Sequence, residues 1–168
     1  PTIGVSIASR KRMRTEILQA PEIKKLLVHA KEFEPEWYFI WAFAVYTGAR
    51  VNELWALKWS DISEADRIIT IQRGWSRKYK QYKNWTKNGD WRSVSICPPL
   101  QEVIDELKAR NNFLEKNGKE QSEFVLPRPS MFKNWCQAEK LRTFCMEIGI
   151  TPVCFHTLRA CFATELLK

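Results

Sequence analysis

The stretch Thr47-Gly48-Ala49-Arg50-Val51-Asn52-Glu53-Leu54 carries the most information about this fold, together with a second stretch, His156-Thr157-Leu158-Arg159. Each stretch places an arginine at or near the start of an apolar helical segment. Two guanidiniums that converge in a folded protein make a fork-shaped receptor for one phosphate. The sequence therefore predicts a phosphate-binding site built from Arg50 and Arg159.

Arg50 follows a glycine that is expected to end one helix, and it opens the next. Backbone amides at a helix start favour an anion, and a guanidinium beside them adds two parallel donors. The alternative is that Arg50 forms an ion pair with Glu53, three positions on and on the same face. From the residues alone both interpretations stay open. Glu53 is expected to orient the helix or Arg50 itself, and not to be catalytic.

His156 lies three residues before Arg159, so both side chains can face one point on a helix. A histidine beside an arginine-bound phosphate can move a proton or donate to an oxygen. The alternative is a capping or core histidine. Cys154 and His156 are two possible metal ligands without a second pair, which is far short of a zinc site. We expect no metal and no cofactor.

Outward from these stretches, the hydrophobic pattern predicts a mainly α-helical domain with a small three-stranded antiparallel sheet, in the α+β class. Helices are expected at 21–32, at 36–47 (buried on all sides), from 50 through 57, from 98 to about 114, at 130–148 and from 157. Strands are expected at 67–72, 80–86 and 92–96, paired in that order as a meander, with a short extended piece at 124–126.

The segment 72–92 combines positive charge with aromatic rings. It holds seven lysines and arginines, one acid (Asp90), and five tryptophans and tyrosines. Basic side chains along a phosphate backbone, with rings near sugars, suit nucleic acid, although a solvated strand pair is the alternative. Lys87 precedes Asn88-Gly89, a hairpin signal, so it can present an ammonium to a leaving oxygen. Otherwise it is an ordinary exposed lysine.

Length and composition fit one domain with a hydrophobic core and favour a polyanionic partner. The 168 residues are 45% hydrophobic, with a formal net charge of +8 and a pI of about 9.4. Five cysteines form no paired framework and are expected to be small core residues in a reducing cytosol. No secretory signal is evident, and the apolar run 37–46 is too short to span a membrane.

In chain order, Arg50, the hairpin lysine Lys87 and the His156-x-Leu-Arg159 segment resemble the catalytic domain of tyrosine recombinases, the phage integrase family. The resemblance covers residues 15–168, a partial catalytic domain, after a basic linker at 1–14. The motifs that carry it are Thr47 to Leu54 with Leu57 to Ile62, His156 to Arg159 with Phe162-Ala163-Thr164, and Thr86-Lys87 ahead of Arg92-x-Val94.

The resemblance implies site-specific DNA recombination or integration without metal or nucleotide cofactor. A tyrosine attacks the scissile phosphate, forms a 3′-phosphotyrosine and releases a 5′-hydroxyl. Arg50 and Arg159 would hold the non-bridging oxygens, His156 would act in acid-base catalysis, and Lys87 would protonate the leaving oxygen. The expected partners are double-stranded DNA and, for the full-length protein, further copies on DNA. The expected location is the cytoplasm, at a bacterial nucleoid or in a phage-infected cell.

The chain departs from the family pattern at the nucleophile. The family's tyrosine follows the second arginine by two to three dozen residues, whereas all four tyrosines here precede Lys87. We therefore expect a fragment of a longer recombinase that is inactive alone. The alternatives are a non-catalytic DNA-binding module that keeps the fold as a relic and a type IB topoisomerase-like enzyme. An RNA-binding protein is a more distant one.

Overall fold

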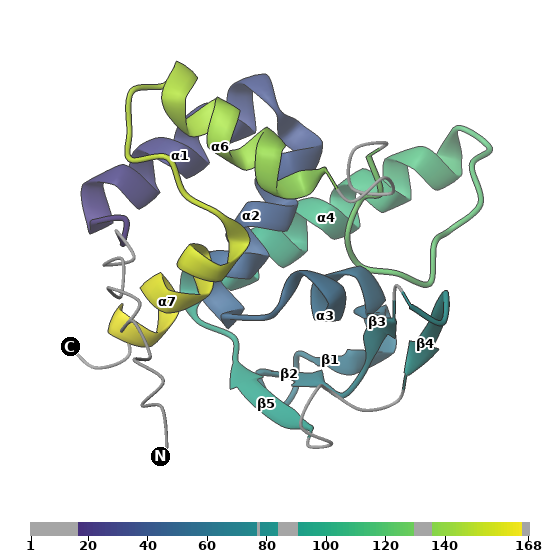
Figure 1. Cartoon of the computed structure of the whole chain (residues 1–168). Coiled ribbons are helices and arrows are strands. Elements are labelled where there is room, and N and C mark those ends of the chain that lie inside the picture. The colour runs from purple at the N-terminus through teal and green to yellow at the C-terminus, as the bar shows by residue number, and fades with distance from the viewer. Residues whose placement is uncertain (1–16, 77, 84–90, 130–135, 166–168) are drawn as a thin grey trace, which may run out of the picture.

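The computed structural model describes residues 17–76, 78–83, 91–129 and 136–165 (Figure 1). The helices are α1 (Ala20–Phe33), α2 (Pro35–Thr47), α3 (Val51–Ala56), a 3-10 turn η1 (Trp59–Asp61), α4 (Pro98–Lys116), α6 (Gln137–Glu147) and α7 (Phe155–Glu165). The strands are β1 (Ile62–Ser63), β2 (Ile68–Ile71), β3 (Gly74–Ser76), β4 (Gln81–Lys83) and β5 (Arg92–Ser95). The predicted class, mainly helical with a small antiparallel sheet, is confirmed.

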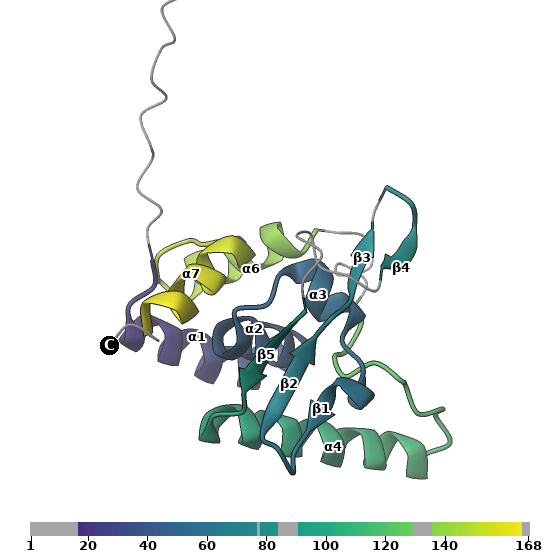
Figure 2. The same cartoon turned by 90° about the horizontal axis from the view of Figure 1, so that it is seen from below.

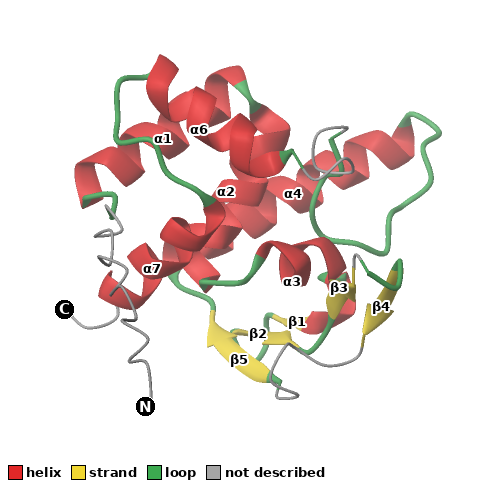
Figure 3. Ribbon diagram, in the orientation of Figure 1, coloured by secondary structure: helices red, strands yellow, loops and turns green. Residues whose placement is uncertain are grey.

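Helix α2 is the centre of the core. Its residues from Trp37 to Val45 are all buried, as the wholly apolar run predicts. It contacts α1, α3, α4 and α7, while the strands lie along one edge of the helical body (Figure 3). Trp41 is fully buried; its ring stacks on that of Trp37 and meets the Phe144 ring of α6 in a tilted arrangement. Among the described residues, no helix combines the length and apolar character that a membrane crossing needs.

The sheet differs from the predicted meander. Its order is β1-β2-β5, all antiparallel, and β4 pairs with β3 in a separate two-stranded hairpin. The reason is burial. β5 turns Val94 onto the core opposite Ile69, whereas β4 (Gln81, Tyr82, Lys83) has no apolar face to cover it. Figure 2 shows the β3–β4 hairpin projecting away from the three-stranded sheet. The predicted Asn88-Gly89 turn lies outside the described residues.

Several element ends also differ from prediction. Helix α3 stops at Ala56, and Leu57 is extended because its carbonyl accepts from the Val125 amide at 3.0 Å. The predicted extended piece at 124–126 is thereby held against residues 57–59. Helix α6 begins at Gln137, with residues 130–135 outside the described part. Helix α7 begins at Phe155, because the Cys154 carbonyl already accepts from the Thr157 and Leu158 amides.

The cysteines bear out only part of the core prediction. All five lie outside any disulfide bond. Cys145 and Cys161 are buried, Cys97 and Cys154 are half-buried, and Cys136 is exposed just before α6. The prediction is wrong for Cys136 because it precedes the helix and so lies off its buried stripe.

Candidate active site

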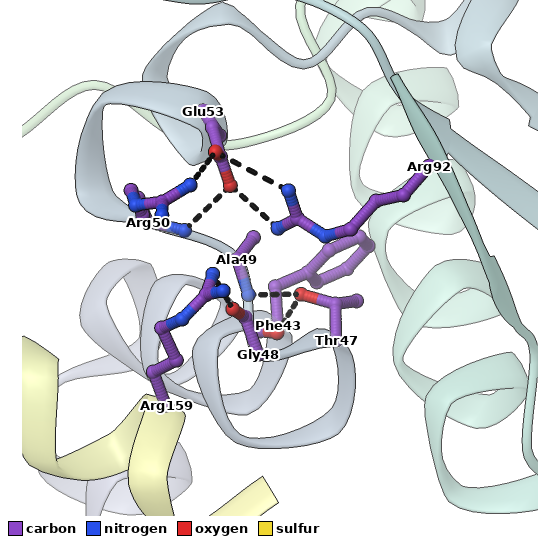
Figure 4. A network of polar contacts seen from close by, with 8 residues as sticks. All are labelled: Phe43, Thr47, Gly48, Ala49, Arg50, Glu53, Arg92 and Arg159. Carbon is purple, nitrogen blue, oxygen red and sulfur yellow. Dashed lines mark hydrogen bonds and ion pairs between the residues drawn. The ribbon is translucent and has the colours of Figure 1, made fainter. Parts of the chain in front are cut away.

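The loop between α2 and α3 shapes the site (Figure 4). Helix α2 ends at Thr47, and the next residue, Gly48, has a φ of 58°, which favours glycine. Thr47 Oγ1 donates to the Phe43 carbonyl at 2.5 Å and accepts from the Ala49 amide at 3.2 Å. A Cβ on Gly48 would also clash with the Phe162 ring of α7, whose Cγ would be 3.0 Å away. The tight bend therefore lets α7 approach and delivers Arg50 to the start of α3.

Arg50 and Glu53 are joined twice. The Glu53 carboxylate accepts from the Arg50 backbone amide at 2.8 Å and from Arg50 Nη1 at 2.9 Å. The predicted ion pair between Arg50 and Glu53 is thus present. The orienting role of Glu53 stays a prediction that this contact supports. Since α3 has only six residues and the Arg50 amide is engaged by Glu53, its backbone adds little to an anion receptor. The guanidinium, with 37% of its side chain exposed, keeps further N–H donors for one.

Arg92 is a member of this cluster that the sequence analysis did not assign to the site. From β5 it donates to both oxygens of Glu53, at 2.6 and 3.3 Å. The alternation of side chains along the strand could have indicated this position. Arg92 shares a strand face with the buried Val94, so it points inward and needs a buried carboxylate.

The Glu53 side chain is 3% exposed, and its charge is held by these arginines. Burial alone would raise the pKa of Glu53. The hydrogen bonds from Arg92, the Arg50 amide and the Arg50 side chain outweigh burial and lower that pKa below its ordinary value. Glu53 is therefore an anion in the folded protein, and it fixes two guanidiniums from separate elements.

Arg159 reaches the same place from α7. Its Nη1 donates to the Gly48 carbonyl at 2.6 Å, two residues before Arg50. Burial lowers the pKa of Arg159, and the charges of Arg50 and Arg92 act in the same direction. The two predicted arginines are thus brought together, as Figure 4 shows. Arg50 and Arg92 bind the one Glu53 carboxylate, and Arg159 adds a third guanidinium at the Gly48 carbonyl. The cluster therefore has an excess of positive charge that suits a phosphate.

A model of the phage integrase family matches residues 16–168. The chain belongs to the phage integrase family. Prophage integrase IntR of Escherichia coli (strain K12) is 28% identical over 106 residues, which are 63% of this chain and 25% of that protein. The chain thus spans about a quarter of the length of that curated relative.

Solved structures share this integrase fold. XerA recombinase matches with 23% identity and a TM-score of 0.66, over 95% of this chain and 52% of that one. The Tn1549 transposon integrase in complex with transposon right end DNA matches with 13% identity and a TM-score of 0.75, over 96% and 56%. A lambda integrase dimer bound to a core site matches with 19% identity and a TM-score of 0.67, over 97% and 56%. At these identities the likeness supports the fold.

The other two predicted site residues, His156 and Lys87, differ in what the structure shows of them. His156 lies in the first turn of α7, exposed to solvent and one helical turn before Arg159. That position rejects the core alternative, since the ring is not buried. Lys87 lies in segment 84–90, outside the described residues. Within the described ranges, no three His, Cys, Asp or Glu side chains gather as possible metal ligands.

Beside the arginine cluster lies a groove of about 980 Å³ between α1, α2, β5 and α7. Arg92 and Arg159 line it together with apolar side chains of α1 such as Ile23 and Leu27. Arg50 does not line it. The arginine cluster is therefore open on a side where two of its three cations meet an apolar wall.

Proposed function

We propose that this chain is the phosphate-binding part of a site-specific DNA recombinase. The reaction would be cleavage and rejoining of DNA strands through a 3′-phosphotyrosine, without a cofactor. The observation that carries the proposal is the contact of Arg159 with Gly48, two residues from Arg50. It supports a receptor in which both guanidiniums face one phosphodiester, where they would stabilise the charge of the transition state.

Each site residue has a proposed role that suits its charge and position. Arg50 and Arg159 bind the two non-bridging oxygens, and Glu53 with Arg92 holds Arg50 in place. His156 exchanges a proton at the attacking or phosphate oxygen, because it lies one turn from Arg159 on α7. Lys87 protonates the leaving 5′-oxygen. The nucleophile matches none of the four tyrosines of this sequence, so residues 15–168 are proposed as part of the catalytic domain.

Double-stranded DNA is the proposed partner, because a chain of net charge +8 carries a basic hairpin next to this site. Self-association on DNA is proposed for the complete protein. The related lambda integrase was solved as a dimer on a core site and as a tetramer on a Holliday junction. We place the reaction in the cytoplasm, at the nucleoid or in a phage-infected cell.

The test uses the complete gene product and DNA from around its own gene. The substrate carries a nick just 3′ of the cleavage point, so cleavage releases a short strand that bears the new 5′-hydroxyl. That strand diffuses away and cannot rejoin, so the covalent 3′ adduct accumulates. Arg50→Ala and Arg159→Ala should each lower the adduct rate by about 100-fold or more while DNA affinity changes only a few-fold. Arg142→Ala, an exposed arginine of α6, is the control and should keep both.

Other outcomes identify the alternatives. Wild-type cleavage rates in both site variants would reject the phosphate-binding assignment. DNA binding without any adduct would favour a non-catalytic DNA-binding module. Relaxation of supercoils without exchange of strands would favour a type IB topoisomerase-like enzyme.

A further inference from the structure

The β3–β4 hairpin lies outside the three-stranded sheet, so something other than the sheet must hold it. Within the hairpin, Trp75 and Tyr82 are paired across the strands, and their rings meet edge to face at 4.8 Å. Toward the body, the Tyr82 ring stacks on Phe124 at 5.3 Å, and β3 contacts α3. The hairpin carries Lys78, Lys80 and Lys83 among its described residues. The contact of β3 with α3 and the Tyr82–Phe124 ring pair thus hold a strongly cationic hairpin against the body.

Arg128 sits at the junction of the hairpin, α3 and segment 123–126. Its guanidinium carbon lies 3.7 Å from the centre of the Phe124 ring and 4.0 Å from the centre of the Trp55 ring. Its Nη2 donates to the Trp55 carbonyl at 2.7 Å and to the Tyr82 hydroxyl at 3.2 Å. One planar group therefore touches α3, the segment that pairs with residues 57–59, and strand β4.

We propose that Arg128 is a positioning residue that fixes the cationic β3–β4 hairpin against α3, and so sets where the hairpin meets DNA relative to Arg50. The DNA part of this inference rests on the proposed function. The hairpin part does not, because it follows from contacts within the chain.

Arginine suits this junction and lysine does not. The flat guanidinium can face both aromatic rings, and it has several N–H donors in a fixed plane. The Trp55 carbonyl belongs to the last turn of α3, where helix carbonyls lack partners within the helix. An ammonium could reach that carbonyl, but it would leave the space over the rings unfilled and Tyr82 without its partner.

The surrounding charge argues for a role beyond packing. Lys58 Nζ lies 5.6 Å from the centre of the Phe124 ring, and Lys83 Nζ lies 4.4 Å from the centre of the Tyr79 ring. Arg128 is thus a third cation over aromatic rings at the base of the basic hairpin, here those of Trp55 and Phe124. Of these three cations, only Lys58 has an acidic partner, Glu123, among the described contacts. Like charges gathered on one surface repel each other in the free protein. A polyanion that lies across them relieves that repulsion.

The experiment compares Arg128→Lys with Arg110→Lys on the chain itself. Arg110 is a half-exposed arginine of α4 that donates to Glu36 at 2.9 Å. Arg110→Lys therefore makes the same chemical change away from the hairpin and serves as the matched control. Amide exchange at residues 74–83 and tryptic cleavage after Lys78, Lys80 and Lys83 report on the hairpin. Affinity for double-stranded DNA reports on function, and exchange in α2 reports on the whole fold.

We expect Arg128→Lys to speed hairpin exchange and cleavage by about tenfold and to weaken DNA binding by about three- to tenfold, with α2 unchanged. Tyr82→Phe, which removes only the hydroxyl, should shift the same readouts by about two- to threefold. Hairpin exchange and DNA affinity equal to those of Arg110→Lys would overturn the proposal. Equal acceleration in α2 and the hairpin would also overturn it, since Arg128 would then stabilise the whole fold.

The proposed function and the role of Arg128 in holding the hairpin can be rejected separately. If the wild-type chain binds no DNA, the proposed function fails, and with it the DNA part of the Arg128 proposal. The exchange rates of residues 74–83 still decide whether Arg128 holds the hairpin. If the wild-type chain binds DNA and Arg128→Lys binds equally well with an unchanged hairpin, only the Arg128 proposal fails.

Discussion

Arg159 donates from Nη1 to the backbone carbonyl of Gly48 at 2.6 Å, across 111 positions of sequence. The acceptor belongs to the bend that presents Arg50, so the second arginine motif also holds the loop of the first. Because the acceptor is a backbone oxygen, this contact depends on the path of the chain and on Arg159, and not on a second side chain. The two motifs are therefore coupled by geometry as well as by charge.

Arg159→Lys should separate charge from geometry. An ammonium can reach the Gly48 carbonyl or a phosphate oxygen, but it lacks the fork that would serve both. We expect the adduct rate of the complete gene product to fall about 100-fold, with a loss of unfolding free energy of only about 1 kcal/mol. Arg142→Lys is the matched control. A wild-type adduct rate in Arg159→Lys would show that a positive charge alone is sufficient.

Gly48→Ala should destabilise the fold for two reasons. The residue has a φ of 58°, and its new methyl group would clash with the Phe162 ring. Gly149→Ala is the matched control, since Gly149 has a φ of 64° but no atom near its Cβ position. We expect a loss of about 1 kcal/mol for Gly149→Ala and about 2 to 4 kcal/mol for Gly48→Ala, measured by urea unfolding.

A double-mutant cycle tests the steric part of that difference. In a Phe162→Ala background, Gly48→Ala should cost no more than Gly149→Ala. An unchanged excess cost in that background would mean that the Phe162 ring is not the cause.

Local patterns predicted the helical fold well and the strand pairing poorly. The apolar run in α2, with Gly48 after it, specifies a buried helix and its end without long-range information. Strand order depends on which segment has an apolar face to pack on the core. The local pattern at residues 80–86 does not show that β5 has the better apolar face. The β-branched strand β2 could therefore be predicted, but its second partner, β5, could not be told apart from β4.

The same limit applies to the site. Arg50 and Arg159 were predicted because each lies in a recognisable motif. Arg92 was not, because its role depends on the buried Glu53 carboxylate, 39 positions away in the chain. Arg128 has no motif at all, since its partners come from α3, β4 and the Phe124 segment.

Binding of the chain to double-stranded DNA should weaken steeply with salt, because phosphate contacts release counterions. Lys78 and Lys83 both lie over the Tyr79 ring of the hairpin, at 5.2 and 4.4 Å. The double variant Lys78→Gln/Lys83→Gln should lower the slope of log affinity against log salt by about two. Lys116→Gln, at the exposed end of α4, is the control and should leave the slope unchanged. A slope unchanged in the double variant would remove the hairpin from the DNA surface.

Glu53→Gln should destabilise the fold at neutral pH. It removes the one carboxylate that Arg50 and Arg92 share while keeping the size of the side chain. We expect a loss of about 3 kcal/mol in the free energy of unfolding, since each arginine is about one-third exposed and keeps part of its hydration. Urea unfolding at about pH 7 measures it. A loss no larger than that of an exposed Glu→Gln change would mean that the cluster does not stabilise the fold.

The cost of Glu53→Gln should also depend on pH in a defined direction. The pKa of Glu53 in the folded protein is lowered from the ordinary value of 4.5, so the unfolded chain takes up a proton first as the pH falls. The stability that Glu53 contributes is complete above 4.5 and is lost as the pH falls through the folded pKa. The difference between wild type and Glu53→Gln should therefore shrink as the pH is lowered below 4.5. Glu64, whose pKa is lowered chiefly by a hydrogen bond from Lys108, is exposed, so Glu64→Gln should show a much smaller change. A difference for Glu53→Gln that stays constant over this range would mean that its carboxylate titrates alike in the folded and unfolded chain.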